Sequence, residues 1–175
     1  LLLQPPDSLG IDFTRPPASI KVEGTWPEPQ PYVASLQAIW EGLYTRFGLK
    51  IGPTLDPLFP PDYWQHYLYF NAGWFYGPCP ARFGEIFTRI ATEIEADPGP
   101  MLAAQSLDPW LDQVALPLVI HALGGTRPPA SLALDGPASC HYRALPLLYA
   151  REEDEVLTRL EEITQDPALR RLLRD

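Results

Sequence analysis

Positive charge is scarce in this chain. Lys21 and Lys50 are its only lysines, and the formal net charge at pH 7 is −9. Binding to nucleic-acid phosphates requires clustered Lys and Arg side chains, but the arginines here are scattered along the sequence. The composition therefore argues against a nucleic-acid partner, and an acidic surface of this kind mainly keeps a protein in solution.

Long hydrophobic runs and a cysteine framework are also missing. No segment approaches the roughly 18 apolar residues of a membrane-spanning helix, and Leu1-Leu2-Leu3 is too short for the core of a signal peptide. Cys79 and Cys140 are the only cysteines, and two reduced thiols in the core are favoured over a disulfide between them, although the disulfide stays open. These absences predict a cytoplasmic protein without a membrane span.

Several common catalytic signatures are absent as well. The sequence has no Gly-rich phosphate loop, no G-x-S-x-G elbow, no H-E-x-x-H and no paired C-x-x-C. With three histidines and two cysteines, a structural zinc site is not expected.

Helices are predicted where apolar residues recur at every third or fourth position. The 22 prolines concentrate in the connections between these segments, where they oppose helix formation. The expected helices are Pro31–Phe47, ended by Gly48; a segment that follows Pro80 and ends at Asp97; a segment with Asp108 as N-cap and Pro109 at its first position, kinked at Pro117 and ended by Gly124; Glu152–Ile163; and a short helix after Asp166-Pro167.

Four short strands are predicted between these helices, at Ala18–Val22, Leu68–Tyr76, Ser131–Leu134 and Ala138–Tyr142. Alternating strands and helices indicate an α/β fold, but four short strands are too few for a complete doubly wound sheet. We therefore expect an incomplete small mixed sheet flanked by helices. The chain is interpreted as a single domain or fragment over residues 1–175, in which residues 151–175 form C-terminal helices.

Four segments that can carry chemistry follow one another in a fixed order. An apolar strand end and loop at Leu1–Pro6 is followed by Tyr69–Phe75, which contains Asn71-Ala72-Gly73-Trp74. The third segment contains Asp112-Gln113 near a helix start, and the fourth contains His141 after a further strand. Glycine inside a strand, as at Gly73, marks a bulge or a close approach to the backbone.

This order resembles the second, acceptor-side half of nucleotide-diphospho-sugar glycosyltransferases with the GT-A fold, over roughly Leu1 to Tyr149. The resemblance implies that Asn71, Ala72, Gly73 and Trp74 bind the sugar, and that Asp112 and Gln113 are catalytic residues facing the donor sugar and the acceptor. It also implies that His141 completes a site for Mn²⁺ or Mg²⁺. The implied partners are a nucleotide-sugar donor and a glycan or small-molecule acceptor.

The chain departs from this family in two respects, since it contains no Asp-x-Asp motif and no upstream nucleotide-binding βαβ units. Residues 1–150 are therefore interpreted as glycosyltransferase-like, and the missing donor-binding half is expected before Leu1. Without that half the chain is expected to be inactive.

Each of these residues also has a structural interpretation that the sequence leaves open. Asn71 can satisfy the backbone of a strand kink, Asp112 and Gln113 can be first-turn residues favoured by the helix dipole, and His141 can be a core histidine. The aromatic residues from Tyr63 to Tyr76 can be core packing. The alternative functions are a non-catalytic acidic interaction or scaffold domain with an aromatic partner-binding patch, and a carbohydrate-binding module without transfer chemistry.

Overall fold

A computed structural model describes residues 5–21, 24, 26–28, 32, 34–129, 132, 139 and 153–165. Within these residues a two-stranded antiparallel sheet accompanies five α-helices, which confirms an incomplete α/β domain. The elements are η1 (Pro6–Leu9), β1 (Ala18–Ile20), α1 (Leu36–Arg46), η2 (Gly52–Thr54), η3 (Trp64–His66), β2 (Phe70–Phe75), α2 (Pro80–Ala96), α3 (Gly99–Leu102), α4 (Leu111–Ala122) and α6 (Asp154–Gln165).

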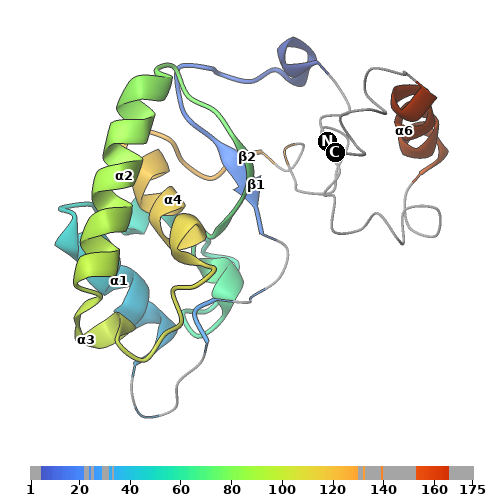
Figure 1. Ribbon diagram of the computed structural model, residues 1–175. Helices are drawn as coiled ribbons and strands as arrows, with labels where there is room; N and C mark the ends of the chain where they lie inside the picture. Colours follow the sequence, from blue (N-terminus) through green and yellow to red (C-terminus); the bar gives the residue numbers. More distant parts are fainter. Residues whose placement is uncertain are drawn as a thin grey trace.

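Helix α4 forms the centre of the main body. It lies between α2 on one side and the β1–β2 ribbon on the other (Figure 1), and every residue from Gln113 to Ile120 is buried. A helix that is apolar on all sides is buried on all sides. The mostly apolar composition of α4 therefore agrees with its central position. Pro117 lies inside α4, as predicted.

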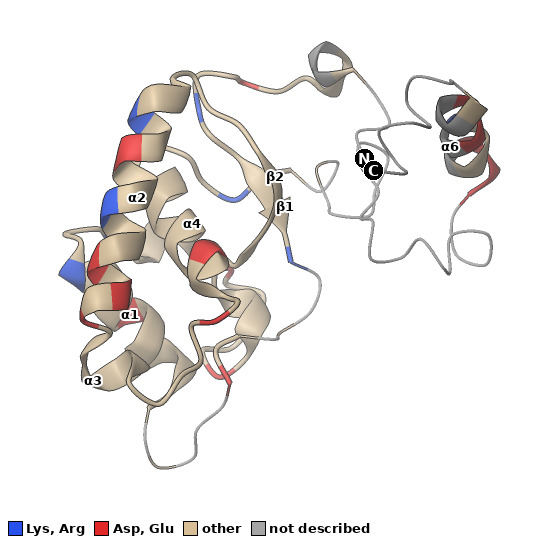
Figure 2. Ribbon diagram, viewed as in Figure 1, with Lys and Arg blue, Asp and Glu red and all other residues tan. Residues whose placement is uncertain are grey.

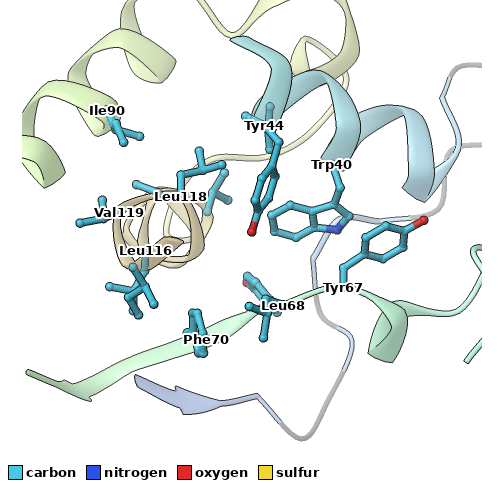
Figure 3. Close-up of a cluster of buried hydrophobic side chains, with 14 of the residues drawn as sticks. Trp40, Tyr44, Tyr67, Leu68, Phe70, Ile90, Leu116, Leu118 and Val119 are labelled. Atoms are coloured by element: carbon cyan, nitrogen blue, oxygen red, sulfur yellow. The ribbon is translucent and has the colours of Figure 1, made fainter. Parts of the chain in front are cut away.

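Three neighbouring elements direct their apolar side chains onto α4. Figure 3 shows Ile90 from α2, the rings of Trp40 and Tyr44 from α1, and Leu68 and Phe70 from the β2 segment arranged around Leu116, Leu118 and Val119. All of these side chains are at most 2% exposed. Full burial of one such side chain stabilises the fold by about 1.5–3 kcal/mol, so this cluster holds the sheet and the helices together.

Helix α2 shows the predicted two-sided pattern. Phe83, Ile90 and Ile94 are buried, and charged residues of both signs alternate along the opposite side (Figure 2). Arg89 and Glu93 form an exposed ion pair there at 3.1 Å, which contributes only about 0.3–0.5 kcal/mol. The C-terminal end of α2 is tied to α1, because the Arg46 guanidinium donates to the carbonyl oxygens of Glu93 and Asp97.

Two predicted helix starts were wrong. Helix α1 begins at Leu36 rather than Pro31, because the Ser35 hydroxyl caps it by accepting a hydrogen bond from the N–H of Ala38 at 3.1 Å. Helix α4 begins at Leu111, and neither Asp108 nor Pro109 belongs to it. Residues 108–110 form a turn in which the Ser106 hydroxyl donates to the Asp108 carbonyl oxygen.

The other predicted elements agree more closely with the structure. The strand at Ala18, the helix after Pro80 and the left-handed glycines Gly48 and Gly124 are confirmed, and α6 confirms the predicted C-terminal helix. The strands expected at 131–134 and 138–142 and the helix after Pro167 lie outside the described residues, as do Leu1–Gln4. Cys79 is an exposed free thiol, so its expected place in the core was wrong, and Cys140 is not among the described residues.

One side-chain amide holds two distant segments together. The Gln105 Oε1 accepts a hydrogen bond from the Glu28 N–H at 2.9 Å, and the Gln105 Nε2 donates to the Glu28 carbonyl oxygen at 3.0 Å. Next to this clamp, the Trp26 Nε1 donates to the Ser106 carbonyl oxygen at 3.0 Å. The loop after β1 is thereby fixed to the segment before α4.

The fold is expected to lose stability above about pH 10, the pKa of a tyrosine in an unfolded chain. Burial raises the pKa of Tyr44 to about 12, so the unfolded state releases this proton at a lower pH than the folded state. The stabilisation that comes from Tyr44 is fully present below about pH 10 and is lost as the pH rises towards 12. Urea unfolding of the wild-type protein and Tyr44→Phe, at about pH 8 and about pH 11, measures it.

The phenylalanine variant is expected to differ little from the wild type at the lower pH, because no hydrogen bond of normal geometry joins the Tyr44 hydroxyl to a described residue. At the higher pH the variant should be the more stable protein. Burial also raises the pKa values of Tyr67 and Tyr76 to about 12, so part of the alkaline loss should remain. An equal loss in both proteins would contradict the assignment to Tyr44.

Candidate functional site

The segment Asn71–Trp74 lies in an irregular part of β2. Ala18 of β1 pairs with Phe75 and Ile20 pairs with Phe70, so β2 carries extra residues between the two pairs and the ladder shifts its register. Inside this irregularity the Asn71 Oδ1 accepts a hydrogen bond from the Gly73 N–H at 2.7 Å. The kink expected from the sequence is therefore present, and Asn71 satisfies its backbone.

This hydrogen bond limits what Asn71 can offer a ligand. Asn71 is 3% exposed, and its carbonyl oxygen is already occupied by Gly73. The Asn71 NH₂ group can still donate to a ligand, and its side-chain oxygen keeps one further lone pair. Ala72 and Trp74 are half-buried, and Gly73 is exposed.

The first turn of α4 supplies the second part of the site. Asp112 is half-buried, and its Oδ1 accepts a hydrogen bond from the N–H of Gln113 at 2.7 Å. That contact satisfies one free N–H group at the helix start, where a negative charge is also favoured by the helix dipole. Gln113 is 6% exposed, and none of the described residues donates a hydrogen bond to its Oε1; a buried acceptor left without any donor is costly.

Lys21 joins these two parts. Its ammonium group lies 4.2 Å from the centroid of the Trp110 ring and 5.2 Å from that of the Tyr69 ring, and the Lys21 N–H donates to the Tyr69 carbonyl oxygen at 2.9 Å. Trp110 is the N-cap residue of α4, and Tyr69 directly precedes β2. The start of α4 and the start of β2 thus meet at the end of β1.

Only a weak sequence signal pointed to Lys21 and Trp110. A lysine directly after an apolar strand, in a chain with one other lysine, is unusual, but its 2% exposure depends on rings that lie far away in the sequence. Contacts of a cation with aromatic faces contribute about 2 kcal/mol or more where water is excluded. Lys21 and Trp110 therefore position the strand and the helix that carry Asn71 and Asp112.

The predicted metal ligand cannot be placed, because His141 lies outside the described residues. Among the residues that the structure does describe, no three His, Cys, Asp or Glu side chains gather into a group that could hold a metal ion. Asp112 alone therefore does not fit a Mn²⁺ or Mg²⁺ site, which requires several oxygen ligands around one ion.

The other histidines and several aromatic residues have structural contacts. The ring of His66 shares a hydrogen bond with the Asp56 carbonyl oxygen at 2.7 Å, and the ring of His121 packs at 5.7 Å from that of Tyr44. Tyr67 is buried and stacks on Trp40 at 6.2 Å, so it offers no face to a sugar. Core packing is thus confirmed for Tyr67, whereas Tyr63 is exposed.

Arg127 and Asp56 form a further charged pair, away from Lys21. The Arg127 Nε lies 3.9 Å from the Asp56 Oδ2, and both side chains are mostly buried, with 29% and 17% exposed. Burial lowers the pKa of Arg127 and the Asp56 carboxylate opposes that effect. This pair ties the loop before β2 to the chain that follows α4.

Comparison with known proteins gives one match. Residues 1–124 match the model of a family described as the Rhodobacterales glycosyltransferase domain. Nothing among the curated proteins or the solved structures matches the chain. None of the helices in the described part of the chain combines the length and the apolar character needed to cross a membrane.

Proposed function

Because this chain belongs to the Rhodobacterales glycosyltransferase domain family, we propose that it supplies the sugar- and acceptor-binding side of a transferase that uses a nucleotide-sugar donor. The family match covers β1, β2 and the whole of α4, and β2 and α4 carry Asn71, Asp112 and Gln113. The single observation that supports the assignment of the site is the meeting of β2 and α4 around Lys21.

The side chains suit the charge that sugar transfer develops. The bond between the anomeric carbon and the leaving diphosphate oxygen breaks, and the acceptor oxygen bonds to that carbon while it gives up its proton. The Asp112 carboxylate orients the acceptor hydroxyl, takes its proton and stabilises positive charge on the sugar. The Gln113 Oε1, to which no described residue donates, accepts from one sugar hydroxyl, and the Asn71 NH₂ group donates to another.

The finer parts of the proposal rest on the order of the sequence motifs. A donor-binding half of the GT-A type would precede Leu1, and Mn²⁺ or Mg²⁺ would bind there with help from His141. If bound, the ion would neutralise charge on the leaving diphosphate. A chain restricted to residues 1–175 would then have little activity of its own.

Calorimetric titration with UDP-sugars and GDP-sugars, with and without Mn²⁺, tests this proposal. The protein extended upstream of Leu1 by the proposed donor-binding half, called the full-length protein from here on, is expected to bind one class of nucleotide sugar. It should hydrolyse that compound slowly when no acceptor is present. Residues 1–175 alone should bind the same compounds much more weakly. Absence of nucleotide-sugar binding by the full-length protein, under both metal conditions, would rule the proposal out.

Two other outcomes have their own interpretation. Binding of glycans with no dependence on nucleotide or metal would indicate a carbohydrate-binding module. Self-association without affinity for any sugar nucleotide would indicate an interaction domain.

A further inference from the structure

Three aromatic side chains form a continuous array at the C-terminal end of β2. The ring of Trp74 is stacked on that of Tyr76, with centroids 5.9 Å apart and planes at 13°. The ring of Phe13 follows at 5.2 Å from Tyr76, tilted by 42°. Phe13 is 43% exposed, and Trp74 and Tyr76 are half-buried, so all three rings keep part of their surface at the outside of the molecule.

The array is held in place by contacts on its inner side. The Trp74 Nε1 donates to the Ser139 hydroxyl at 3.2 Å, and the Tyr76 N–H donates to the Pro17 carbonyl oxygen at 3.3 Å. The Tyr76 hydroxyl is buried and makes no hydrogen bond to a described residue. The orientation of Trp74 and the backbone of Tyr76 are thus set before any ligand arrives, which lowers the entropy cost of binding.

One acidic and one basic residue, Asp12 and Arg15, flank Phe13 in the turn that carries it. The Asp12 Oδ1 accepts a hydrogen bond from the Thr14 N–H at 2.9 Å, and the Thr14 bonds hold the pKa of Asp12 below its usual value. The Arg15 Nε lies 3.9 Å from the Asp12 Oδ2, with both side chains more than half exposed.

These groups favour a neutral sugar over an anion. A pyranose has apolar C–H faces that match aromatic rings, and hydroxyls at its edge that match carboxylate and guanidinium groups. The opposite charges of Asp12 and Arg15 leave no excess positive charge for a diphosphate. Trp74 belongs both to this array and to the candidate site, so the array continues that site along β2.

We propose that Phe13, Trp74 and Tyr76 bind a sugar unit of an oligosaccharide acceptor, beyond the unit that receives the transferred sugar. This inference rests on the proposed function, because it places the array on the acceptor side of the same reaction. The acceptor extends from Asp112 along β2 to the exposed ring of Phe13.

Binding of neutral oligosaccharides to the full-length protein without donor tests this inference. The probes are trisaccharides of glucose, galactose and N-acetylglucosamine, compared with the matching monosaccharides, and binding is followed by tryptophan fluorescence. At least one trisaccharide is expected to bind more tightly than its monosaccharide. Phe13→Ala and Tyr76→Ala should each raise its Kd about tenfold.

Two matched variants separate stacking from loss of structure. Tyr76→Phe keeps the ring and removes a hydroxyl that makes no hydrogen bond within the described part of the chain, so the Kd of this variant should equal that of the wild type. Phe75→Ala removes an exposed ring that instead stacks on Phe83 at 4.8 Å, and it should also leave the Kd unchanged. Circular dichroism of each variant confirms that it is folded.

Three other outcomes would distinguish failure of the array from failure of the proposed function. Wild-type transfer activity with an unchanged Kd in Phe13→Ala and Tyr76→Ala would overturn the array and leave the proposed function standing. Glycan binding that needs these rings, in a protein that neither binds nor hydrolyses nucleotide sugars, would overturn the proposed function and leave the aromatic array standing as a glycan-binding site. Self-association that Phe13→Ala abolishes, with no trisaccharide bound at millimolar concentration, would show that the rings bind protein instead.

Discussion

Gly125→Ala is expected to prevent stable folding. A Cβ atom at this position would lie 2.1 Å from the Pro16 carbonyl oxygen, 2.5 Å from the Ile120 Cγ2 and 2.9 Å from the Ile120 carbonyl oxygen. Two of these atoms are backbone, and the N–H of Gly125 also donates to the Ile120 carbonyl oxygen at 2.8 Å. The residue cannot move away without opening the end of α4, so we expect a loss of more than about 3 kcal/mol.

Urea unfolding followed by circular dichroism measures this effect against two glycine controls. At Gly124, where φ is +83° and no atom lies within 4 Å of an added Cβ, alanine should cost about 1–2 kcal/mol through backbone strain alone. At Gly84, inside α2 with nothing within 4 Å, alanine should stabilise the protein by about 0.5–1 kcal/mol. A Gly125→Ala protein as stable as Gly124→Ala would contradict the close approach of Pro16.

Asp112→Asn is expected to have the largest effect on activity. If the carboxylate takes the proton of the acceptor hydroxyl, its replacement should lower kcat for sugar transfer by about 10²–10⁴-fold. An asparagine oxygen can still accept the hydrogen bond that the Gln113 N–H gives to Asp112, so the helix start should survive. Initial rates with saturating donor and acceptor in the full-length protein measure the change.

The matched control is Asp108→Asn, which removes a carboxylate four residues earlier. Asp108 is exposed, lies in the turn before α4 and is not a helix cap. The Asp108→Asn variant should therefore transfer sugar at the wild-type rate. If Asp112→Asn retains full activity and loses only about 0.3–1 kcal/mol of stability, the carboxylate serves the helix dipole alone.

The elements that could be predicted from sequence are those set by neighbouring residues. The spacing of Phe83, Ile90 and Ile94 defines the buried side of α2 without reference to the rest of the chain. The strand irregularity at Asn71 was also accessible, because its cause is a hydrogen bond across two residues. Local chemistry was sufficient in both cases.

The helix starts show where competing local signals mislead. Pro31 is well suited to a first turn, but the hydroxyl of Ser35 caps α1 instead, and both signals were present in the sequence. Before α4, the Asp108-Pro109 pair resembles a cap, whereas Trp110 holds that position and packs on Lys21. The second outcome depends on a residue about 90 positions away, so no local rule could supply it.

The candidate site divides in the same way. Residue types and spacing singled out Asn71, Asp112 and Gln113, whereas the approach of the start of β2 to the start of α4 depends on the pairing of β1 with β2 and on the rings around Lys21. The aromatic array joins Phe13 to Tyr76, which are distant in sequence, and no periodic pattern connects them. The sequence therefore predicted candidate residues better than it predicted their neighbours.

The Gln105 clamp has a consequence for the rates of folding and unfolding. It joins positions separated by 77 residues, and closing a loop of that length costs on the order of 4 kcal/mol in chain entropy. Such a contact forms late, after local helices have docked, and is weak or absent in the transition state. The clamp should therefore mainly lower the unfolding rate and leave the folding rate almost unchanged.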